Sequence, residues 1–254
     1  MIYLLFLTIT LLILLFAFYQ WQHFMIFSPT HYRDFSLGEE YEYIAIYSDD
    51  NRELEGVVYT PPSATPQTQR VLFFAGRSHD SVGLIKRLSE CYPETQIITF
   101  NYRGYGKSKG SANEKNILKD GLKIAEVVEK NYGDFYLLGF SLGSSVAAFI
   151  ASKQRVKGLI LVGAFDSIQA LARERFKFAK LLRYKFATVD FVQDVDAPTY
   201  MFASRDDETT YIQNARRVKE KIKNLAHYEE FDGLSHKEIL WERSVVAKIR
   251  EVLE

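Results

Sequence analysis

The stretch Phe135-Tyr-Leu-Leu-Gly-Phe-Ser-Leu-Gly-Ser-Ser-Val-Ala-Ala-Phe149 determines the interpretation of the whole chain. It begins as a short apolar run typical of a strand buried on both faces, and it ends in small and apolar residues that suit a buried helix. Between them, the G-x-S-x-G pattern centred on Ser141 is typical of a sharp turn that presents a nucleophilic serine. Gly139 and Gly143 would remove side chains that collide with the neighbouring strand and helix. Because so short a pattern also recurs by chance, a serine without a catalytic role is the alternative interpretation. A catalytic role requires an acid and a histidine elsewhere in the chain.

Two later loops supply these partners. An acidic loop, Ser204-Arg-Asp-Asp-Glu208, follows one apolar run, and Asp232-Gly-Leu-Ser-His236 follows the last one. A serine hydroxyl is a poor nucleophile unless an imidazole takes its proton and a carboxylate orients that imidazole. The order serine, acid, histidine is the order that accompanies this type of turn. We therefore predict Ser141 as nucleophile and His236 as base.

The identity of the acid is open at this point, because three acidic residues are adjacent and only one can face the imidazole. The alternatives are Asp206, Asp207 and Glu208. The other four histidines are weaker candidates for the base. His23 and His31 belong to the N-terminal region, His227 lies in a strand pattern, and His79 precedes the serine in the sequence. An oxyanion hole needs two backbone N–H groups. We expect one from Leu142 and one from the loop Gly76-Arg-Ser78.

Strand and helix patterns alternate along most of the chain. The runs Tyr41–Tyr47 and Leu54–Tyr59 flank turn residues and predict a hairpin, and from Arg70 onward short apolar runs alternate with helical spacings. This pattern predicts a mostly parallel sheet of eight strands with helices on both faces. Ligands bind beyond the carboxyl ends of such strands, so the serine, acid and histidine loops should meet at one edge.

Charge and cysteine content exclude some classes of protein. The 254 residues include 32 Lys and Arg and 32 Asp and Glu, and a net charge of zero argues against a nucleic-acid-binding protein. Cys91 is the single cysteine, so no disulfide can form within the chain. A chain of 254 residues is long enough for one globular domain with a large core and an appendage.

The N-terminus carries that appendage. Ile2 to Tyr19 contains no charged residue, and such a run spans about 27 Å as a helix, close to the thickness of a bilayer core. A cleaved signal peptide would have basic residues before the run and small residues after it, and a core helix would rarely be apolar on every face. We predict a membrane partner and an uncleaved single-pass anchor. Arg33, partly offset by Asp34, gives only a slight lean towards a cytoplasmic catalytic domain.

Taken together, residues 37–254 resemble the α/β-hydrolase superfamily, and the chain is similar to its membrane-anchored α/β-hydrolase-domain proteins. Besides the serine turn, three segments carry the resemblance. Asn101-Tyr-Arg-Gly-Tyr-Gly-Lys-Ser108 matches the family's N/D-Y-R-G-x-G-x-S loop, Pro198 through Asp207 matches its strand and acid loop, and Gly233-Leu-Ser-His236 matches its G-x-x-H. The resemblance implies the α/β-hydrolase fold, with no metal or organic cofactor.

The resemblance also implies roles for single residues. Its register places the acid at Asp207, with Asp206 as the second choice, and the oxyanion donors at the backbone of Leu142 and Arg77. The family usually has His-Gly after the third strand and again before the acid. Here these positions are Ala75-Gly76 and Ala203-Ser204, which changes the surroundings of the oxyanion and acid loops.

A segment before the acid strand is expected to form a small helical cap over the site. Leu171–Phe186 holds six Lys and Arg against one Glu, interleaved with apolar residues. As a helix it would either lie on an anionic membrane surface or cover the site with a solvated basic face. We predict an anchor at 1–23, a connector at 24–36 and a hydrolase domain at 37–254, with the cap inserted at about 164–197.

The expected function is a membrane-anchored serine hydrolase that cleaves carboxylic ester or thioester bonds of acyl lipids or acylated molecules. Two alternatives stay open. An aminopeptidase-like serine peptidase would share the turn and the triad, but it would need an acidic site for the substrate amine. A catalytically inactive binding or scaffold protein would keep the fold with a dead site. Acyl-chain length and oligomeric state are not encoded in these motifs.

Overall fold

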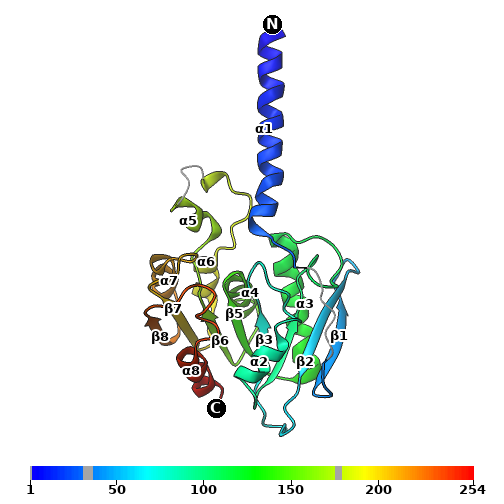
Figure 1. Ribbon diagram of the computed structural model, residues 1–254, viewed down its shortest axis with the longest axis vertical. Coiled ribbons are helices and arrows are strands. Elements are labelled where there is room, and N and C mark those ends of the chain that lie inside the picture. Colours follow the sequence, from blue (N-terminus) through cyan, green and yellow to red (C-terminus); the bar gives the residue numbers. More distant parts are fainter. Residues whose placement is uncertain (1, 31–36, 175–178) are drawn as a thin grey trace.

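The computed structural model describes residues 2–30, 37–174 and 179–254. Eight strands form one central sheet in the order β1-β2-β4-β3-β5-β6-β7-β8 (Figure 1). The strands are β1 (Tyr41–Tyr47), β2 (Glu53–Tyr59), β3 (Arg70–Phe74), β4 (Gln96–Phe100), β5 (Tyr136–Phe140), β6 (Gly158–Val162), β7 (Thr199–Ser204) and β8 (Leu225–Phe231). The first two strands pair antiparallel, β2 pairs antiparallel with β4, and all other pairs are parallel. The predicted sheet is confirmed.

Helices cover both faces of the sheet because successive strand side chains point to opposite faces. In β3, Leu72 and Phe74 join one buried cluster and Val71 and Phe73 join the other. The first cluster holds side chains of α3 (Glu114–Tyr132), α4 (Leu142–Ala151) and α7 (Ile212–Lys219), and the second holds those of α2 (Ile85–Cys91) and α8 (Arg243–Leu253). The central parallel strands are thus buried on both sides, as parallel sheets require.

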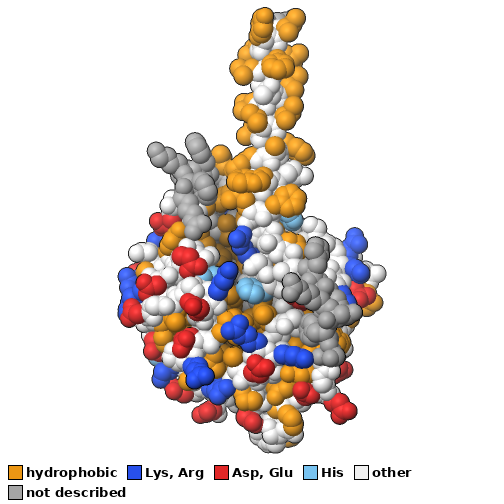
Figure 2. Space-filling view, viewed as in Figure 1, with side chains coloured by type: hydrophobic (Ala, Val, Ile, Leu, Met, Phe, Trp, Pro, Cys, Tyr) orange, Lys and Arg blue, Asp and Glu red, His pale blue; other side chains and the backbone are white. Residues whose placement is uncertain are grey.

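The helix α1 (Ile2–Ile26) projects from this domain as a single straight rod (Figure 1). Apolar side chains lie along the face of it that Figure 2 shows, and its most hydrophobic window has no buried residue. By length and composition it is able to cross a membrane, and its 25 residues span about 37 Å. Its last turns contact the domain, and among the described residues of α1 only Gln22 and Ile26 are buried.

The cap is small and its helices are short, which corrects the expectation of one basic helix over Leu171–Phe186. It consists of α5 (Ile168–Arg173), η1 (Ala179–Leu181), α6 (Thr188–Phe191) and η2 (Val192–Asp194), and residues 175–178 of the basic segment lie outside the described residues. The backbone N–H groups of Lys185 and Phe186 donate to the carboxylate of Glu114, at 2.7 and 2.6 Å. Because these donors bind a side chain of α3, they do not form helical hydrogen bonds.

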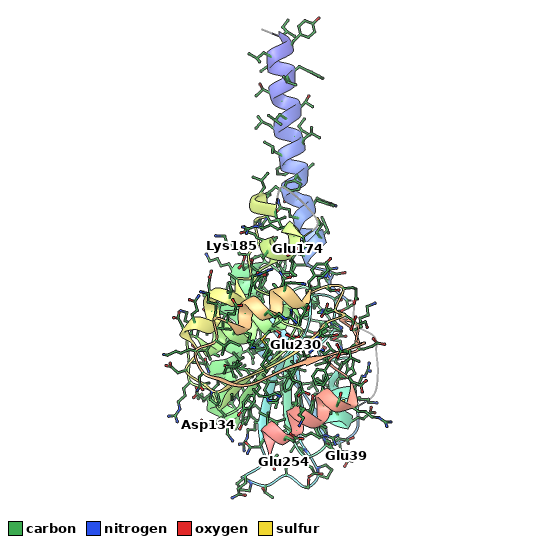
Figure 3. The ribbon with its side chains drawn as sticks, turned by 90° about the vertical axis from the view of Figure 1, so that its left-hand side faces the viewer. Glu39, Asp134, Glu174, Lys185, Glu230 and Glu254 are labelled. Carbon is green, nitrogen blue, oxygen red and sulfur yellow. The ribbon has the colours of Figure 1, made fainter. Side chains whose placement is uncertain are left out.

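The cap lies at the same end of the domain as α1. Lys185 and Glu174 lie beside the base of α1, whereas Asp134 and Glu254 lie at the opposite end (Figure 3). The slight lean towards a cytoplasmic catalytic domain depended on Arg33 and Asp34. Both residues lie outside the described residues, so the orientation stays a prediction. The fold therefore places the end of the domain that carries the cap close to the medium around α1.

Candidate active site

Ser141 occupies the sharp turn between β5 and α4. Its backbone has φ 54° and ψ −119°, a left-handed conformation that is strained for a residue with a side chain. A Cβ at Gly143 would overlap the carbonyl of Phe74, and a Cβ at Gly139 would overlap the carbonyl of Gly143. The hydroxyl of Ser144 donates to the carbonyl of Gly139 at 2.9 Å and braces the turn. The glycines therefore allow the strand, turn and helix to approach closely.

His236 lies next to this serine although 95 residues separate them in sequence. Its Nε2 is 2.9 Å from Ser141 Oγ, and its Nδ1 is 2.7 Å from Asp207 Oδ2. The ring is stacked on Phe140, with centroids 5.0 Å apart and an interplanar angle of 25°. All three polar side chains are buried. The sheet edge thus brings together the serine, histidine and acid that the sequence singled out.

The acidic loop after β7 gives each of its three carboxylates a different contact. Asp207 faces the imidazole, whereas Asp206 Oδ2 accepts from the backbone N–H of Gly233 at 2.6 Å. Glu208 Oε2 accepts from the backbone N–H of His236 at 3.1 Å. Asp206 and Glu208 therefore hold the backbone of the histidine loop, and Asp207 contacts the ring.

Several groups act on the ionisation of Asp207. Burial by itself would raise the pKa of its carboxyl. The hydrogen bond and charge of His236 act in the opposite direction, as do the hydrogen bonds from Thr210. Together they outweigh burial and lower the pKa below its ordinary value. The hydroxyl of Thr210 donates to Oδ2 at 2.7 Å, and the N–H groups of Thr209 and Thr210 donate to Oδ1 at 2.8 and 2.7 Å. Asp207 is therefore an anion at neutral pH, able to stabilise a positive imidazole.

The two expected oxyanion residues lie near the serine. Leu142 is the first residue of α4, and the first N–H groups of a helix have no partner within it. Arg77 follows β3, and its carbonyl accepts from the hydroxyl of Tyr105 at 2.5 Å and from the N–H of Ser28 at 3.3 Å. Both residues line the cavity that contains Ser141. Their backbone roles remain a prediction.

The cavity at Ser141 has a volume of about 270 Å³ and a mostly apolar lining. Ser141, Leu142 and Arg77 lie on its catalytic side. Most of the remaining wall comes from the end of α1 and from the cap, through Met25, Ile26, Phe165, Ile168, Leu171, Ala172 and Leu182, and Thr209 completes it. No Asp or Glu is among the described residues that line it. Such a cavity suits an apolar chain attached to a carbonyl group.

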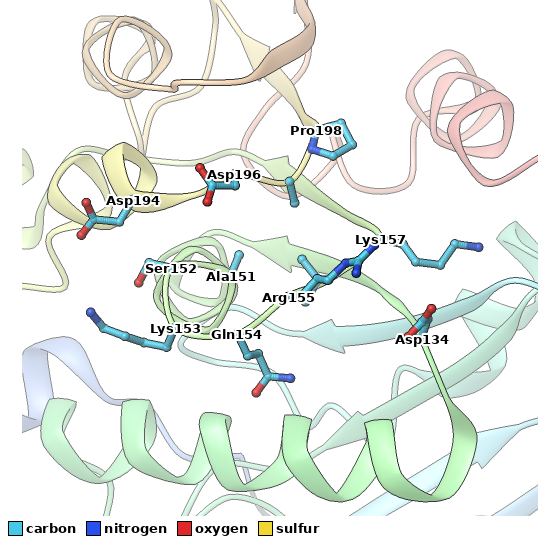
Figure 4. A pocket seen from close by; sticks show the side chains of 12 residues that line it. Asp134, Ala151, Ser152, Lys153, Gln154, Arg155, Lys157, Asp194, Asp196 and Pro198 are labelled. Atoms are coloured by element: carbon cyan, nitrogen blue, oxygen red, sulfur yellow. The ribbon is translucent and has the colours of Figure 1, made fainter.

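A larger cavity of about 610 Å³ lies elsewhere and has a polar lining (Figure 4). Lys153, Arg155 and Lys157 line it together with Asp134 and Asp196, next to the amino ends of β6 and β7. Ligands of open α/β sheets bind at the carboxyl ends of the strands, where Ser141 lies. We therefore assign the active site to the cavity at Ser141 and not to this larger cavity.

Comparison with known proteins identifies the family. The family model described as the alpha/beta hydrolase fold matches residues 71–188, which include β3, the serine turn and the start of the cap. The chain belongs to the α/β-hydrolase superfamily. As an α/β-hydrolase with a lipase among its relatives, it is a serine hydrolase.

Three relatives illustrate the extent of the similarity. An alpha/beta hydrolase of Acanthamoeba polyphaga mimivirus is 23% identical over 229 residues, which is 86% of each chain. The lysophosphatidylserine lipase ABHD12 of Danio rerio is 25% identical over 146 residues, but the match covers 48% of this α/β-hydrolase and only 38% of the lipase. The esterase Pf2001 of Pyrococcus furiosus superposes with a TM-score of 0.68 and 16% identity, over 90% of this chain and 96% of that one. This last likeness supports the fold alone.

Sequence reasoning missed two parts of the site. Thr210 is a buried partner of Asp207, and its signal was a pair of threonines directly after the acidic loop, a pattern that caps carboxylates in turns. Met25 and Ile26 line the cavity of this α/β-hydrolase from the end of α1. No local pattern marks them, because their position in the wall of this cavity depends on how a distant helix docks.

Proposed function

We propose that Ser141, His236 and Asp207 form a catalytic triad that hydrolyses carboxylic ester or thioester bonds. The observation that carries this proposal is the continuous hydrogen-bonded chain from Ser141 Oγ through the imidazole to Asp207 Oδ2, with distances of 2.9 and 2.7 Å. This is the geometry in which a serine is activated by a base and the base is oriented by a carboxylate.

The reaction follows from this geometry. His236 Nε2 takes the proton of Ser141 as Oγ attacks the acyl carbon, and the N–H groups of Leu142 and Arg77 stabilise the oxyanion. The imidazolium then protonates the leaving alcohol or thiol, and the acyl group stays on Ser141. Water, deprotonated by His236, attacks the acyl carbon, so that a carboxylic acid leaves and Ser141 regains its proton. Asp207 keeps Nδ1 protonated throughout.

The substrate we propose is an acyl lipid or another long-chain acylated molecule. The mostly apolar cavity at Ser141 supports it, as does the similarity to a lysophosphatidylserine lipase. The aminopeptidase alternative needs an acidic group for the substrate amine, and no described residue lining the cavity is Asp or Glu. Ester hydrolysis is therefore favoured over peptide hydrolysis.

A fluorophosphonate probe tests this proposal directly, since it labels only an activated serine. We expect the full-length protein in detergent to be labelled, and peptide mapping by mass spectrometry to locate the adduct on Ser141. A long-chain acyl ester should slow the labelling by competition, whereas an aminoacyl anilide should not. Failure of the folded protein to react would favour a scaffold protein, and an adduct on another serine would refute the proposed nucleophile.

We also propose that α1 anchors the enzyme in a membrane. Its length and its uniformly apolar, exposed surface support this role. The protein should stay in the membrane pellet after extraction with alkaline carbonate, and its intact mass should include residues 2–26. A mature protein that begins after α1 would show instead that the segment is a cleaved signal sequence.

A further inference from the structure

The last turns of α1 are built into the catalytic domain. Gln22 is only 2% exposed, although the helix before it is almost fully exposed. Its Oε1 accepts from the backbone N–H of Arg183 at 2.7 Å, and its Nε2 donates to the carbonyl of Leu181 at 3.4 Å. A buried side-chain amide whose oxygen and nitrogen both contact the cap backbone fixes the position of the cap relative to α1.

Aromatic residues reinforce this contact on both sides of Gln22. The Arg183 guanidinium lies 4.4 Å from the ring centroid of Tyr19 and 4.5 Å from that of Tyr184. Phe27 is 1% exposed and packs edge-on against Tyr184, with centroids 5.0 Å apart. Such stacking places the guanidinium between α1 and the cap. The end of α1 and the cap therefore behave as one packed unit.

The same end of α1 reaches the loop that carries the expected oxyanion donor. The guanidinium of Arg77 donates to the carbonyl of Met25, in the last turn of α1, where helix carbonyls lack partners. The Arg77 carbonyl in turn accepts from the N–H of Ser28, just after the helix. Met25 and Ile26 line the cavity at Ser141 together with Leu171 of the cap.

From these contacts we propose that the end of α1 is part of the acyl-binding site, and that it selects substrates with one long apolar chain. The chain would lie between Met25 and Ile26 on one side and the cap residues Leu171 and Leu182 on the other, with its carbonyl at Ser141. This inference rests on the proposed ester hydrolysis and adds to it the origin of chain-length specificity.

The position of the cavity explains why the chain would come from the bilayer. Ser141 lies in this cavity, and part of the cavity wall is the last turn of a helix whose earlier residues, Ile2 to Phe16, are mostly exposed and apolar. A chain that leaves the bilayer along α1 would thus move from lipid towards an apolar wall, which limits the cost of hydrating it. A single chain suits the narrow space between one helix turn and a short cap.

Narrowing the cavity from α1 tests the inference. Met25→Trp should lower the ratio of kcat/KM for a dodecanoyl ester to that for an acetyl ester by about tenfold or more, because methylene groups in an apolar pocket each contribute about that factor. The full-length protein is assayed in phosphatidylcholine nanodiscs. Phe24→Trp is the matched control, since Phe24 is 73% exposed on the neighbouring position of the same helix. It should leave the ratio unchanged.

Leu171→Trp narrows the same cavity from the cap and should lower the same ratio, which keeps the test valid if Met25→Trp fails to fold. Fluorophosphonate labelling of each variant reports that the serine is still assembled. An unchanged ratio in both labelled variants would overturn the inference while leaving ester hydrolysis intact. A wild-type protein that neither reacts with the probe nor cleaves any ester would instead refute the proposed function itself.

Discussion

Asp207→Asn should lower kcat for ester hydrolysis by about 10⁴-fold, a smaller loss than the about 10⁶-fold expected for Ser141→Ala. The carboxylate accepts a hydrogen bond from Nδ1 of His236, so Nε2 is free to take the proton of the serine. An asparagine amide can donate to Nδ1 instead and select the tautomer in which Nε2 carries the proton. The base is then unavailable, although the site is sterically unchanged. Initial rates with a chromogenic acyl ester measure the effect.

Asp206→Asn is the matched control, because it changes the adjacent residue in the same way. Asp206 accepts from the N–H of Gly233, and an asparagine oxygen can accept the same bond. We expect kcat to fall by less than about threefold, since a neutral acceptor keeps the loop in place. If the two variants exchanged their effects, Asp206 would be the acid and Asp207 a structural residue.

Arg103→Met should lower the free energy of unfolding by about 3–5 kcal/mol, because it leaves a buried carboxylate without its partner. Arg103 lies in the loop after β4, and its guanidinium donates to Asp120 on α3 at 2.5 and 2.7 Å. Both side chains are buried, at 5% and 7% exposure. The same guanidinium also contacts the exposed carboxylate of Asp50. Urea denaturation followed by tryptophan fluorescence measures the loss.

The pH dependence of this variant has a definite sign. Burial raises the pKa of Asp120 above its ordinary value, and Arg103 opposes that rise. Without Arg103 the pKa of Asp120 should rise further. At pH values between the ordinary pKa and this raised pKa, Asp120 binds a proton in the folded state but not in the unfolded chain. The destabilisation should therefore be largest near neutral pH and shrink as the pH falls towards roughly 4, the ordinary pKa of an Asp.

Two further variants separate the buried pair from surface charge. Adding Asp120→Asn to Arg103→Met should recover part of the lost stability, because the carboxylate that was left unpaired is gone. Lys119→Met is the matched control on α3, since Lys119 pairs with Asp49 where both side chains are exposed. It should leave the denaturation midpoint unchanged. A large effect of Lys119→Met would show that net charge, not burial, governs stability here.

Much of the fold could be predicted because it depends on local patterns. Apolar runs and helical spacings indicated the strands and most helices, and the glycines around Ser141 indicated the turn. Helix ends were less well predicted. The spacing of apolar residues from about Lys237 to Leu253 predicts one helix, but α8 begins only at Arg243, since Ile239 and Leu240 pack into the core as part of a turn.

The cap shows where local reasoning fails. Basic and apolar residues at helical spacing predicted one helix over Leu171–Phe186, yet α5 ends at Arg173. Beyond it, the backbone of Arg183 binds Gln22, and the backbone of Lys185 binds Glu114. These partners are far away in sequence, and their hydrogen bonds compete with those of a helix. Periodicity does not contain that information.

The sequence by itself determined the class of sheet, the position of the serine turn and the place of His236 after the last strand. These features follow from side-chain periodicity, from glycines that permit close approach, and from parallel strands that end at one edge. The family resemblance implied Asp207 as the acid, and the tertiary structure showed that Asp207 contacts the imidazole while Asp206 holds a loop. The tertiary structure alone placed the end of α1 in the wall of the cavity. Both depend on contacts between residues distant in sequence, because adjacent carboxylates are chemically alike and only their packing distinguishes them.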